Sequence, residues 1–256
     1  MLLAIDSGNT NTVFAVFDDN DKVRGEWRLS TSPNRTADEF GLSLKQLMAE
    51  AGLKPKDVTA AIIATVVPAT LFALKTLCRN TFSCDPRVVG EPGLKLGLKV
   101  LVDRPDEVGA DRLVNAVSAF DRYGGPLIVV DFGTATTFDI IDAKGSYLGG
   151  VIAPGVNLSL EALHMAAAKL PRVDVKKTER VTGKDTVAAM QSGIYWGYVS
   201  LIEGLVARLR AEHGDDVEVI ATGGLAPLFT EAVSCIKQSD PELTLRGLLL
   251  VHRRNK

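Results

Sequence analysis

The 256-residue sequence contains few cysteines and aromatic residues and no excess of basic residues. Its three cysteines, Cys78, Cys84 and Cys235, are an odd number without CxxC spacing, so neither a disulfide framework nor a zinc knuckle is predicted. Aromatic residues make up 6% of the chain, and 29 Lys and Arg against 31 Asp and Glu leave a net charge of -2. Nucleic-acid binding usually relies on a basic excess and on aromatic stacking. The composition therefore argues against a nucleic-acid partner.

Long apolar runs are also missing. Met1–Ile5 is apolar but runs straight into Asp6, which is too short for a signal-peptide core. No later run approaches the roughly 18 to 20 residues that span a bilayer. We therefore expect a cytoplasmic protein that does not associate with membranes. The histidines His164, His213 and His252 are far apart, so neither a histidine metal site nor a serine-type triad is predicted.

The common nucleotide-binding motifs are absent as well. The segment Val181–Asp185 comes nearest to a P-loop, but Thr178 stands where the first glycine is required and Asp185 where a Ser or Thr is required. No GxGxxG dinucleotide motif is present. A phosphate site must therefore be sought in other turns.

Strands alternate with helices along the chain, which predicts an α/β fold. The first strands are expected at 2–6, 11–17 and 22–29, and a second set of three at 127–131, 136–141 and 146–152. Further strands are expected from about Thr59 and about Glu218. Helical periodicity is found at 38–51, 69–79, 110–123, 157–169 and 185–212.

The two sets of strands indicate an internal repeat. Asp131 follows Asp6 by 125 residues (131 minus 6), close to half the chain. A repeat of this length indicates duplication of a whole domain, with halves at 1–117 and 118–256 that enclose a cleft. At this offset Gly133 matches Gly8, Thr134 matches Asn9 and Thr137 matches Thr12.

The segment Asp6–Thr10 (Asp-Ser-Gly-Asn-Thr) has the chemistry of a phosphate site. Its glycine allows a ligand to approach the backbone, its amides and Asn and Thr side chains can donate to phosphate oxygens, and its carboxylate can hold hydrated Mg²⁺. Alone, such a segment is more typical of an ordinary hairpin turn. A related turn, Asp131–Thr137, occurs in the second half, and Thr222–Gly224 leaves room for a flat nucleoside. Together the three segments predict nucleotide binding.

These segments resemble the phosphate-1, phosphate-2 and adenosine motifs of the superfamily that contains actin, sugar kinases and Hsp70 chaperones. Within it, the sequence resembles a type III pantothenate kinase over nearly its whole length. The resemblance implies duplicated ribonuclease H-like (actin-like ATPase) domains, each a mixed sheet flanked by helices. It also implies a homodimer and ATP-dependent phosphorylation of pantothenate at its terminal hydroxyl, the first step of coenzyme A biosynthesis. The matching segments are Asp6–Asn11, Ala64–Pro68, Pro105–Arg112, Asp131–Thr137, Gly149–Gly155, Leu170-Pro171, Gly183–Thr186 and Gln191–Gly193.

The resemblance implies that Asp111 is the general base for the substrate hydroxyl and that Arg112 is available to bind the substrate carboxylate. Gly109, Ala110 and Thr186 would complete the pantothenate site. From spacing alone, Asp111 is more simply interpreted as an acid that offsets the dipole of the helix it begins, and Arg112 as a solvated surface charge.

The resemblance also implies the ligands of ATP and of the cations. Asp131 would hold K⁺ or NH₄⁺, and Asp6 would hold the Mg²⁺ that accompanies ATP, mostly through water. The residues implied to contact ATP are Asp6, Ser7, Gly8, Asn9, Thr10, Asn11, Thr12, Val13 and Thr134.

Two alternatives remain open from the sequence. Many relatives carry a tyrosine nine residues before the base, whereas this sequence has Val102, which leaves open a kinase for another small hydroxyl acid. A non-catalytic, nucleotide-dependent regulator of transcription is the other alternative, although Asp6, Asp111 and Asp131 are all present. The basic C-terminal segment 252–256 is predicted to be a solvated tail.

Overall fold

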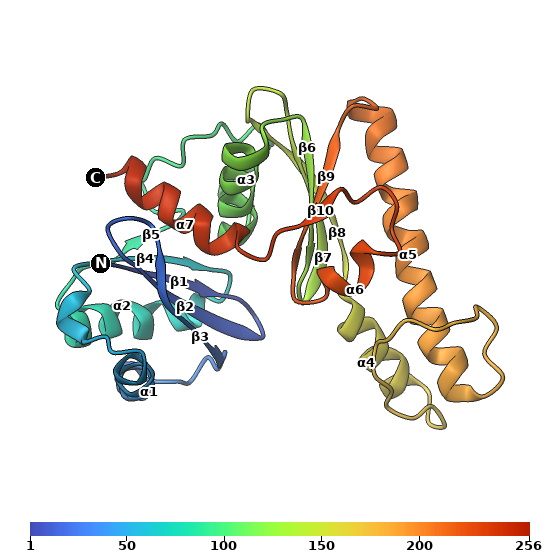
Figure 1. The fold of residues 1–256 in the computed structure, drawn as a ribbon, viewed down its shortest axis with the longest axis horizontal. Coiled ribbons are helices and arrows are strands. Elements are labelled where there is room, and N and C mark those ends of the chain that lie inside the picture. Colours follow the sequence, from blue (N-terminus) through green and yellow to red (C-terminus); the bar gives the residue numbers. More distant parts are fainter. The chain divides into compact units, whose positions relative to one another are not determined.

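The computed structural model describes residues 1–256 as two compact units. One unit comprises Met1–Asp121 and Glu242–Lys256, and the other comprises Arg122–Pro241. Each contains a five-stranded sheet, in the order β3-β2-β1-β4-β5 in the first and β8-β7-β6-β9-β10 in the second (Figure 1). The two orders correspond strand by strand, so the predicted duplication is visible in the topology.

In the first unit, a mixed sheet is covered by helices on both faces. The central strand β1 (Leu2–Ser7) pairs antiparallel with β2 (Asn11–Phe17) and parallel with β4 (Ala60–Thr65). Because β1 is buried on both faces, it reads as a continuous apolar run in the sequence. The outer strands are β3 (Val23–Ser30) and β5 (Arg87–Val88), the helices are α1 (Ala37–Glu50), α2 (Pro68–Phe82), α3 (Ala110–Tyr123) and α7 (Leu243–Arg254), and single 3₁₀ turns lie at Pro55–Asp57 and Pro105–Glu107.

Two separate cores in the first unit show which helices cover which face. Leu3, Ile5 and Phe14 pack with residues of α1 and α2, whereas Leu2, Ala4 and Ala15 pack with residues of α3 and α7. Alternate residues of each strand therefore face different helix pairs, as expected for a period of two.

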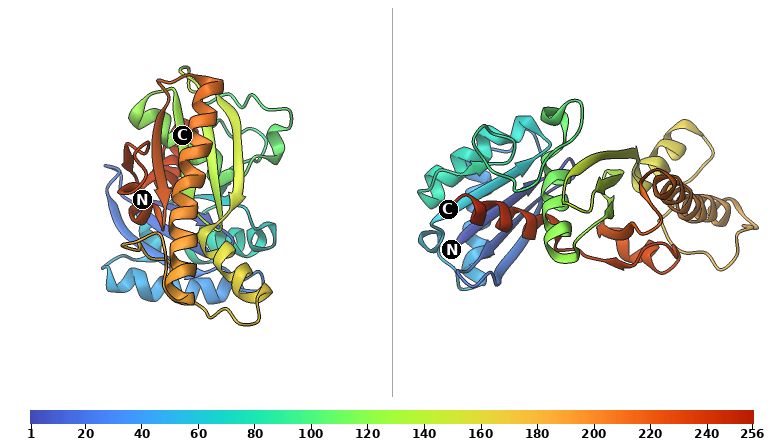
Figure 2. Two further views of the ribbon diagram at one scale, coloured as in Figure 1. Left: turned by 90° about the vertical axis from the view of Figure 1, so that its right-hand side faces the viewer. Right: turned by 90° about the horizontal axis from the view of Figure 1, so that it is seen from above.

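In the second unit, a long helix packs on one face of the sheet. The helix α5 (Thr186–His213) contributes Tyr195, Tyr198 and Ile202 to a core that includes Phe132 and Phe229, whose rings stack at 5.2 Å. Figure 2 shows this helix, in orange, lying along the sheet. The remaining elements are β6 (Leu127–Phe132), β7 (Ala135–Ile141), β8 (Tyr147–Pro154), β9 (Glu218–Gly223), β10 (Gln238–Ser239), α4 (Val156–Ala166) and α6 (Ala226–Thr230). No helix in residues 1–256 combines the length and apolarity required to cross a bilayer.

The structure corrects the predicted residue correspondence between the halves. The offset is 125 for β1 and β6 (127 minus 2) but 124 for β2 and β7 (135 minus 11), because the second turn is one residue shorter. Ser7 pairs with Thr12 across the first turn, whereas Phe132 pairs with Thr136 across the second. Thr134 therefore corresponds to Thr10, and Thr136 to Thr12, in place of the matches predicted from a constant offset.

The basic C-terminal segment was predicted to be a solvated tail, but it ends a helix that packs on the first unit through His252 and Asn255, while Arg253, Arg254 and Lys256 are exposed. His252 is buried in α7, and its Nδ1 lies 2.8 Å from Nη1 of Arg87. Burial, with the charges of Arg87 and Lys256, lowers the pKa of His252 to about 4, so its neutral ring accepts this hydrogen bond. The amide of Asn255 accepts from the N–H of Lys95 at 2.9 Å and donates to its C=O at 2.8 Å.

This packing also explains why the units differ from the predicted halves 1–117 and 118–256. The apolar face of α7 joins the core of the first unit, so residues 242–256 belong to that unit. The sequence pattern of α7 is short and ends in basic residues, although Leu245, Leu248 and Leu249 are buried in this core.

Gly247 makes the contact between α7 and α3 possible, and its substitution is expected to destabilise the protein. A Cβ at this position would lie 2.1 Å from the carbonyl oxygen of Val114. We expect Gly247→Ala to lower the free energy of unfolding by about 1 to 3 kcal/mol, because neither backbone can yield easily.

Gly204→Ala in α5 is the matched control. A Cβ there meets only the flexible end of Arg208, at 3.3 Å, so the better helix propensity of Ala should raise stability by roughly 0.5 to 1 kcal/mol. Urea unfolding of both variants measures the difference, and equal effects would contradict this packing.

Candidate active site

The first predicted phosphate turn joins β1 to β2 at the surface of the first unit. Gly8, Asn9, Thr10 and Asn11 are exposed or half-buried, and the N–H of Gly8 donates to the C=O of Asn11 at 3.0 Å. A Cβ on Gly8 would meet only the oxygen of Asn11, at the ordinary distance of 3.4 Å. The fold itself therefore does not require glycine here, and its absent side chain leaves the backbone open to a ligand.

The side chains on either side of this turn face inward. Ser7 and Thr12 are completely buried, and their hydroxyls lie 3.2 Å apart. Val13 is half-buried, and Asp6, at the end of β1, is also half-buried. Among the residues predicted to contact ATP, the hydroxyls of Ser7 and Thr12 therefore lie behind the turn and not on its surface.

The predicted general base lies close to the carboxyl ends of β1 and β4. The N–H of Val66, just after β4, donates to the C=O of Ser7 at 3.1 Å. A Cβ on Gly109 would lie 3.4 Å from a methyl group of Val66 and 2.6 Å from Oδ1 of Asp111. Glycine at 109 therefore leaves room for the Asp111 carboxylate at the start of α3. Val66, which is hydrogen-bonded to Ser7, also lies near Gly109, so Asp111 is near the strand ends that carry the phosphate turn.

The environment of Asp111 favours a basic carboxylate. Burial raises the pKa of Asp111 above its ordinary value, against the smaller effects of the Arg112 N–H and of its charge. That N–H donates to Oδ1 of Asp111 at 2.7 Å and so fixes the orientation of the carboxylate. Ala110 is buried and Arg112 is half-buried beside it. A held carboxylate with a raised pKa is suited to accept a proton from a hydroxyl.

The second predicted phosphate turn, between β6 and β7, is supported by a glycine. The N–H of Gly155, at the start of α4, donates to the C=O of Thr134 at 3.0 Å, and a Cβ on Gly155 would lie 2.1 Å from the same oxygen. Any other residue at 155 would therefore displace the turn. Thr134 itself is exposed.

Asp131 and the Thr222–Gly224 segment come together in the second unit. Asp131 is opposite Thr222 in the parallel pair of β6 and β9. Gly223 has a φ of +91°, and a Cβ there would lie 2.6 Å from Oδ1 of Asp131, so this glycine is required by both conformation and space. Gly224 has nothing within 4 Å of such a Cβ. Of the two glycines predicted to make room for a nucleoside, Gly224 is the one that faces open space.

The two predicted cation ligands are single carboxylates at strand ends. In residues 1–256, no group of three or more His, Cys, Asp or Glu side chains is placed to hold a metal ion. Carboxylate oxygens suit hard cations such as Mg²⁺, which usually takes one or two carboxylates and completes its shell with phosphate and water. The half-buried carboxylates of Asp6 and Asp131 have the chemistry for a cation that is bound by one carboxylate and other oxygens.

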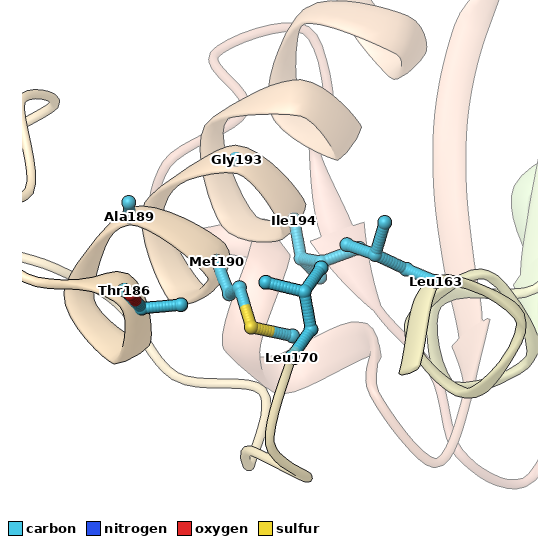
Figure 3. Close-up of a pocket in the computed structure, with 7 residues that line it drawn as sticks. All are labelled: Leu163, Leu170, Thr186, Ala189, Met190, Gly193 and Ile194. Atoms are coloured by element: carbon cyan, nitrogen blue, oxygen red, sulfur yellow. The ribbon is translucent and has the colours of Figure 1, made fainter. Parts of the chain in front are cut away.

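Thr186, predicted to contact pantothenate, lies at the start of α5 in the second unit. It follows the N-cap Asp185, which accepts from the N–H of Ala188 at 2.8 Å. Thr186 lines one end of a groove of about 510 Å³ between α4, α5 and the segment at Leu170 (Figure 3). The other lining residues are all apolar or glycine: Leu163, Leu170, Ala189, Met190, Gly193 and Ile194.

Sequence reasoning missed three residues behind the first turn. Thr31, Thr65 and Thr70 hydrogen-bond with the turn or with the strand ends that carry it. Only Thr65 lies in a segment that matches the family, Ala64–Pro68. The available signal was the run of hydroxyl residues at strand ends, which is too common to stand out without the strand register.

Comparisons with known proteins agree with the predicted family and fold. The family model described as Type III pantothenate kinase matches residues 2–208. A type III pantothenate kinase from Paramagnetospirillum magneticum is 66% identical over 255 residues, which cover 100% of this chain and 98% of the relative.

Among solved structures, a protein from Campylobacter jejuni described as a Baf family transcriptional activator has a TM-score of 0.61 and 19% identity, covering 99% of this chain and 98% of its own. A protein from Sinorhizobium meliloti described as a 2-dehydro-3-deoxygalactonokinase has a TM-score of 0.61 and 16% identity, covering 99% and 96%. At these identities the likeness shows the fold alone. The predicted fold class of two related mixed sheets flanked by helices is confirmed.

The full-length likeness at 66% identity and the match to residues 2–208 therefore establish that this chain belongs to the type III pantothenate kinase family.

Proposed function

We propose that this protein transfers the γ-phosphoryl group of ATP to the terminal hydroxyl of pantothenate, the first step of coenzyme A biosynthesis. The observation that carries the proposal is the half-buried Asp111, whose carboxylate is held by the N–H of Arg112, in a chain of this family whose Gly8–Asn11 turn is open. As an enzyme of this family, the chain is a kinase, and the alternative of a non-catalytic regulator is not favoured. The reaction is proposed to take place in the cytoplasm.

The proposed roles follow the chemistry of each side chain. The Asp111 carboxylate accepts the hydroxyl proton, the freed oxygen attacks the γ-phosphorus, and the bond to the bridging oxygen breaks to release ADP. Arg112 binds the substrate carboxylate, for which a guanidinium is suited. Such a transfer depends mainly on positioning and on charge neutralisation, so a covalent nucleophile is not required.

ATP is proposed to contact the first turn at Gly8–Asn11 together with Asp6 and Val13, and Thr134 of the second turn. The completely buried Ser7 and Thr12 are proposed to support the first turn from behind. Mg²⁺ bound near Asp6 would neutralise phosphate charge, and K⁺ or NH₄⁺ would bind at Asp131. Gly109, Ala110 and Thr186 are proposed to complete the pantothenate site. Val102 is half-buried, and a panel of small hydroxyl acids would show whether its presence relaxes substrate choice.

ADP release coupled to a spectroscopic readout tests the reaction, the substrate and the cation together. We expect ADP release that depends on pantothenate and is faster in K⁺ than in Na⁺, because the larger ion is easier to strip of water at a site of one carboxylate. The absence of pantothenate-dependent ADP, together with a salt-sensitive DNA gel shift, would instead support the regulator. Equal rates in the two salts would contradict only the proposed monovalent cation site at Asp131. The proposed reaction would be unaffected.

Asp111→Asn is expected to lower the turnover rate by about 10² to 10⁴, the usual contribution of a general base, while ATP still binds. In the wild-type enzyme kcat/KM should fall as the pH drops through the raised pKa of Asp111, because protonation removes the base. The variant should lose this acid limb. Steady-state kinetics between pH 4 and 8, with calorimetric titration of ATP, measure both effects. Undiminished turnover in the variant would remove Asp111 from this role.

We also propose that the chain forms a homodimer through the exposed face of α5. Ala189, Gly193, Gly197 and Ser200 form an uncharged, exposed strip along one face of this helix, beside the apolar groove of Figure 3. A Cβ on Gly193 or Gly197 would meet nothing within 4 Å, so another helix can approach closely. A second copy of the chain fits best, because a two-fold axis lets the same strip pack on itself.

Gly193→Arg is expected to convert a dimer to a monomer in sedimentation velocity, because it places a charged side chain in the middle of this strip. Leu42→Arg is the control, since Leu42 is 74% exposed on α1, outside the strip. It should leave the sedimentation coefficient unchanged. A monomeric wild-type protein, or a dimeric Gly193→Arg variant, would contradict the proposed interface.

A further inference from the structure

Five hydroxyl side chains form a hydrogen-bonded chain behind the first phosphate turn. Ser7 lies 3.1 Å from Thr70 and 3.2 Å from Thr12, and Thr12 lies 2.9 Å from Thr31. Thr65 lies 3.4 Å from Thr70 at the inner end. At the outer end, Thr31 Oγ1 donates to the C=O of Gly8 at 2.7 Å. The chain therefore runs from the end of β4 to the backbone of the turn.

The direction of these hydrogen bonds is fixed from the turn inward. A hydroxyl has one proton to donate, and that of Thr31 goes to Gly8. Thr12 must therefore donate to Thr31, and Ser7 must donate to Thr12. The Thr70 hydroxyl also donates to the C=O of Val67 at 2.9 Å, so its single proton is shared between Val67 and Ser7, and the fixed direction ends at Ser7. Each hydroxyl polarises the next, so the bond on Gly8 is strengthened by those behind it.

Thr31 holds the turn at two points. Its side chain binds the C=O of Gly8, and its N–H donates to the C=O of Thr10 at 2.9 Å. In a planar trans peptide, the N–H of the following residue points opposite to the C=O. With the C=O of Gly8 held toward Thr31, the N–H of Asn9 points away from it. This orients an amide donor outward, on the open side of the turn.

The second unit shows that the hydroxyl chain is not a general requirement of this fold. Gly155 occupies the position of Thr31, at an offset of 124, and keeps the backbone hydrogen bond to Thr134. Phe132 replaces Ser7, so Thr136, the counterpart of Thr12, is completely buried with a hydroxyl that has no partner. The same strand–turn–strand unit therefore forms without the chain, and the chain is a specialisation of the first turn.

We propose that Thr31 is a positioning residue for ATP, which, supported by Thr12 and Ser7, fixes the Gly8–Asn9 peptide so that its amide meets a phosphate oxygen. The proposal rests on the proposed function, in which this turn binds the ATP phosphates. Thr31 does not touch the reacting atoms; it acts through the turn.

Thr31→Val removes the hydroxyl at nearly constant volume and keeps the N–H on Thr10. We expect KM for ATP to rise about tenfold, the equivalent of about 1.4 kcal/mol, while KM for pantothenate stays within twofold of wild type. Calorimetric titration of ATP without pantothenate should show the same loss of affinity. Thr31→Ser restores the hydroxyl and should return KM for ATP to near the wild-type value.

Thr12→Val and Thr136→Val form a matched pair for stability. Thr12→Val removes the central hydroxyl of the hydrogen-bonded row. It should lower both the melting temperature and the affinity for ATP. The second removes a buried hydroxyl without a partner, so the melting temperature should stay the same or rise. Comparing the two variants separates the stabilisation that comes from the hydrogen-bonded hydroxyls from the general effect of removing a buried hydroxyl.

Three outcomes would overturn the proposal. Unchanged affinity for ATP in Thr31→Val would overturn it while leaving the proposed function intact. Failure of Thr31→Ser to restore the affinity, or equal increases in both KM values, would show that the substitution only loosens the fold. Wild-type protein that binds no ATP in the titration would overturn the proposed function, and this proposal with it.

Discussion

The register of β1 against β2 is the constraint on which the nucleotide end of the first unit depends. Ser7 lies directly opposite Thr12, so their side chains project to the same face and meet inside the protein. This pairing leaves Gly8–Asn11 as the turn and puts Asn9 and Thr10 outside. A slip of one residue would exchange the two faces of the strand and separate these hydroxyls from their partners. The apolar neighbours Ile5 and Phe14, both fully buried, make that slip costly and so hold the turn in place.

The second unit keeps the strand order of the first, but the turn between its first two strands differs. Its turn is one residue shorter, and phenylalanine replaces serine at 132, where the ring stacks on Phe229 in the core. The backbone of Thr134 is instead set by the close approach of Gly155. One turn is thus held by side-chain hydroxyls and the other by steric contact with a glycine. The two copies keep the same strands while their turns are free to take different roles.

Much of the fold could be predicted because its signals are local. Strands and long helices follow from apolar runs and periodicity, and Asp6, Asp111 and Asp131 follow from motifs that match a family. The packing of α7 could not be predicted, since it depends on Gly247 meeting Val114, a contact between distant parts of the sequence. Thr31 was missed for a similar reason: its function depends on the register of three strands. The shorter second turn could not be seen in the sequence, because an offset of 125 residues still matches Gly133 with Gly8.

Asp111 admits two interpretations, a proposed general base and an acid that offsets a helix dipole, and its surroundings bear on both. An acid in the first turn of a helix is ordinarily stabilised as an anion by the helix dipole, which would lower its pKa. In this protein burial raises the pKa of Asp111, against the smaller lowering effects of the backbone N–H groups of Arg112 and Asp111 and of the Arg112 charge. A Cβ at position 109 would lie 2.6 Å from Oδ1 of Asp111, so glycine leaves room for the carboxylate at this place. The raised pKa and the fixed orientation of this half-buried carboxylate support the proposed role of Asp111 as a base.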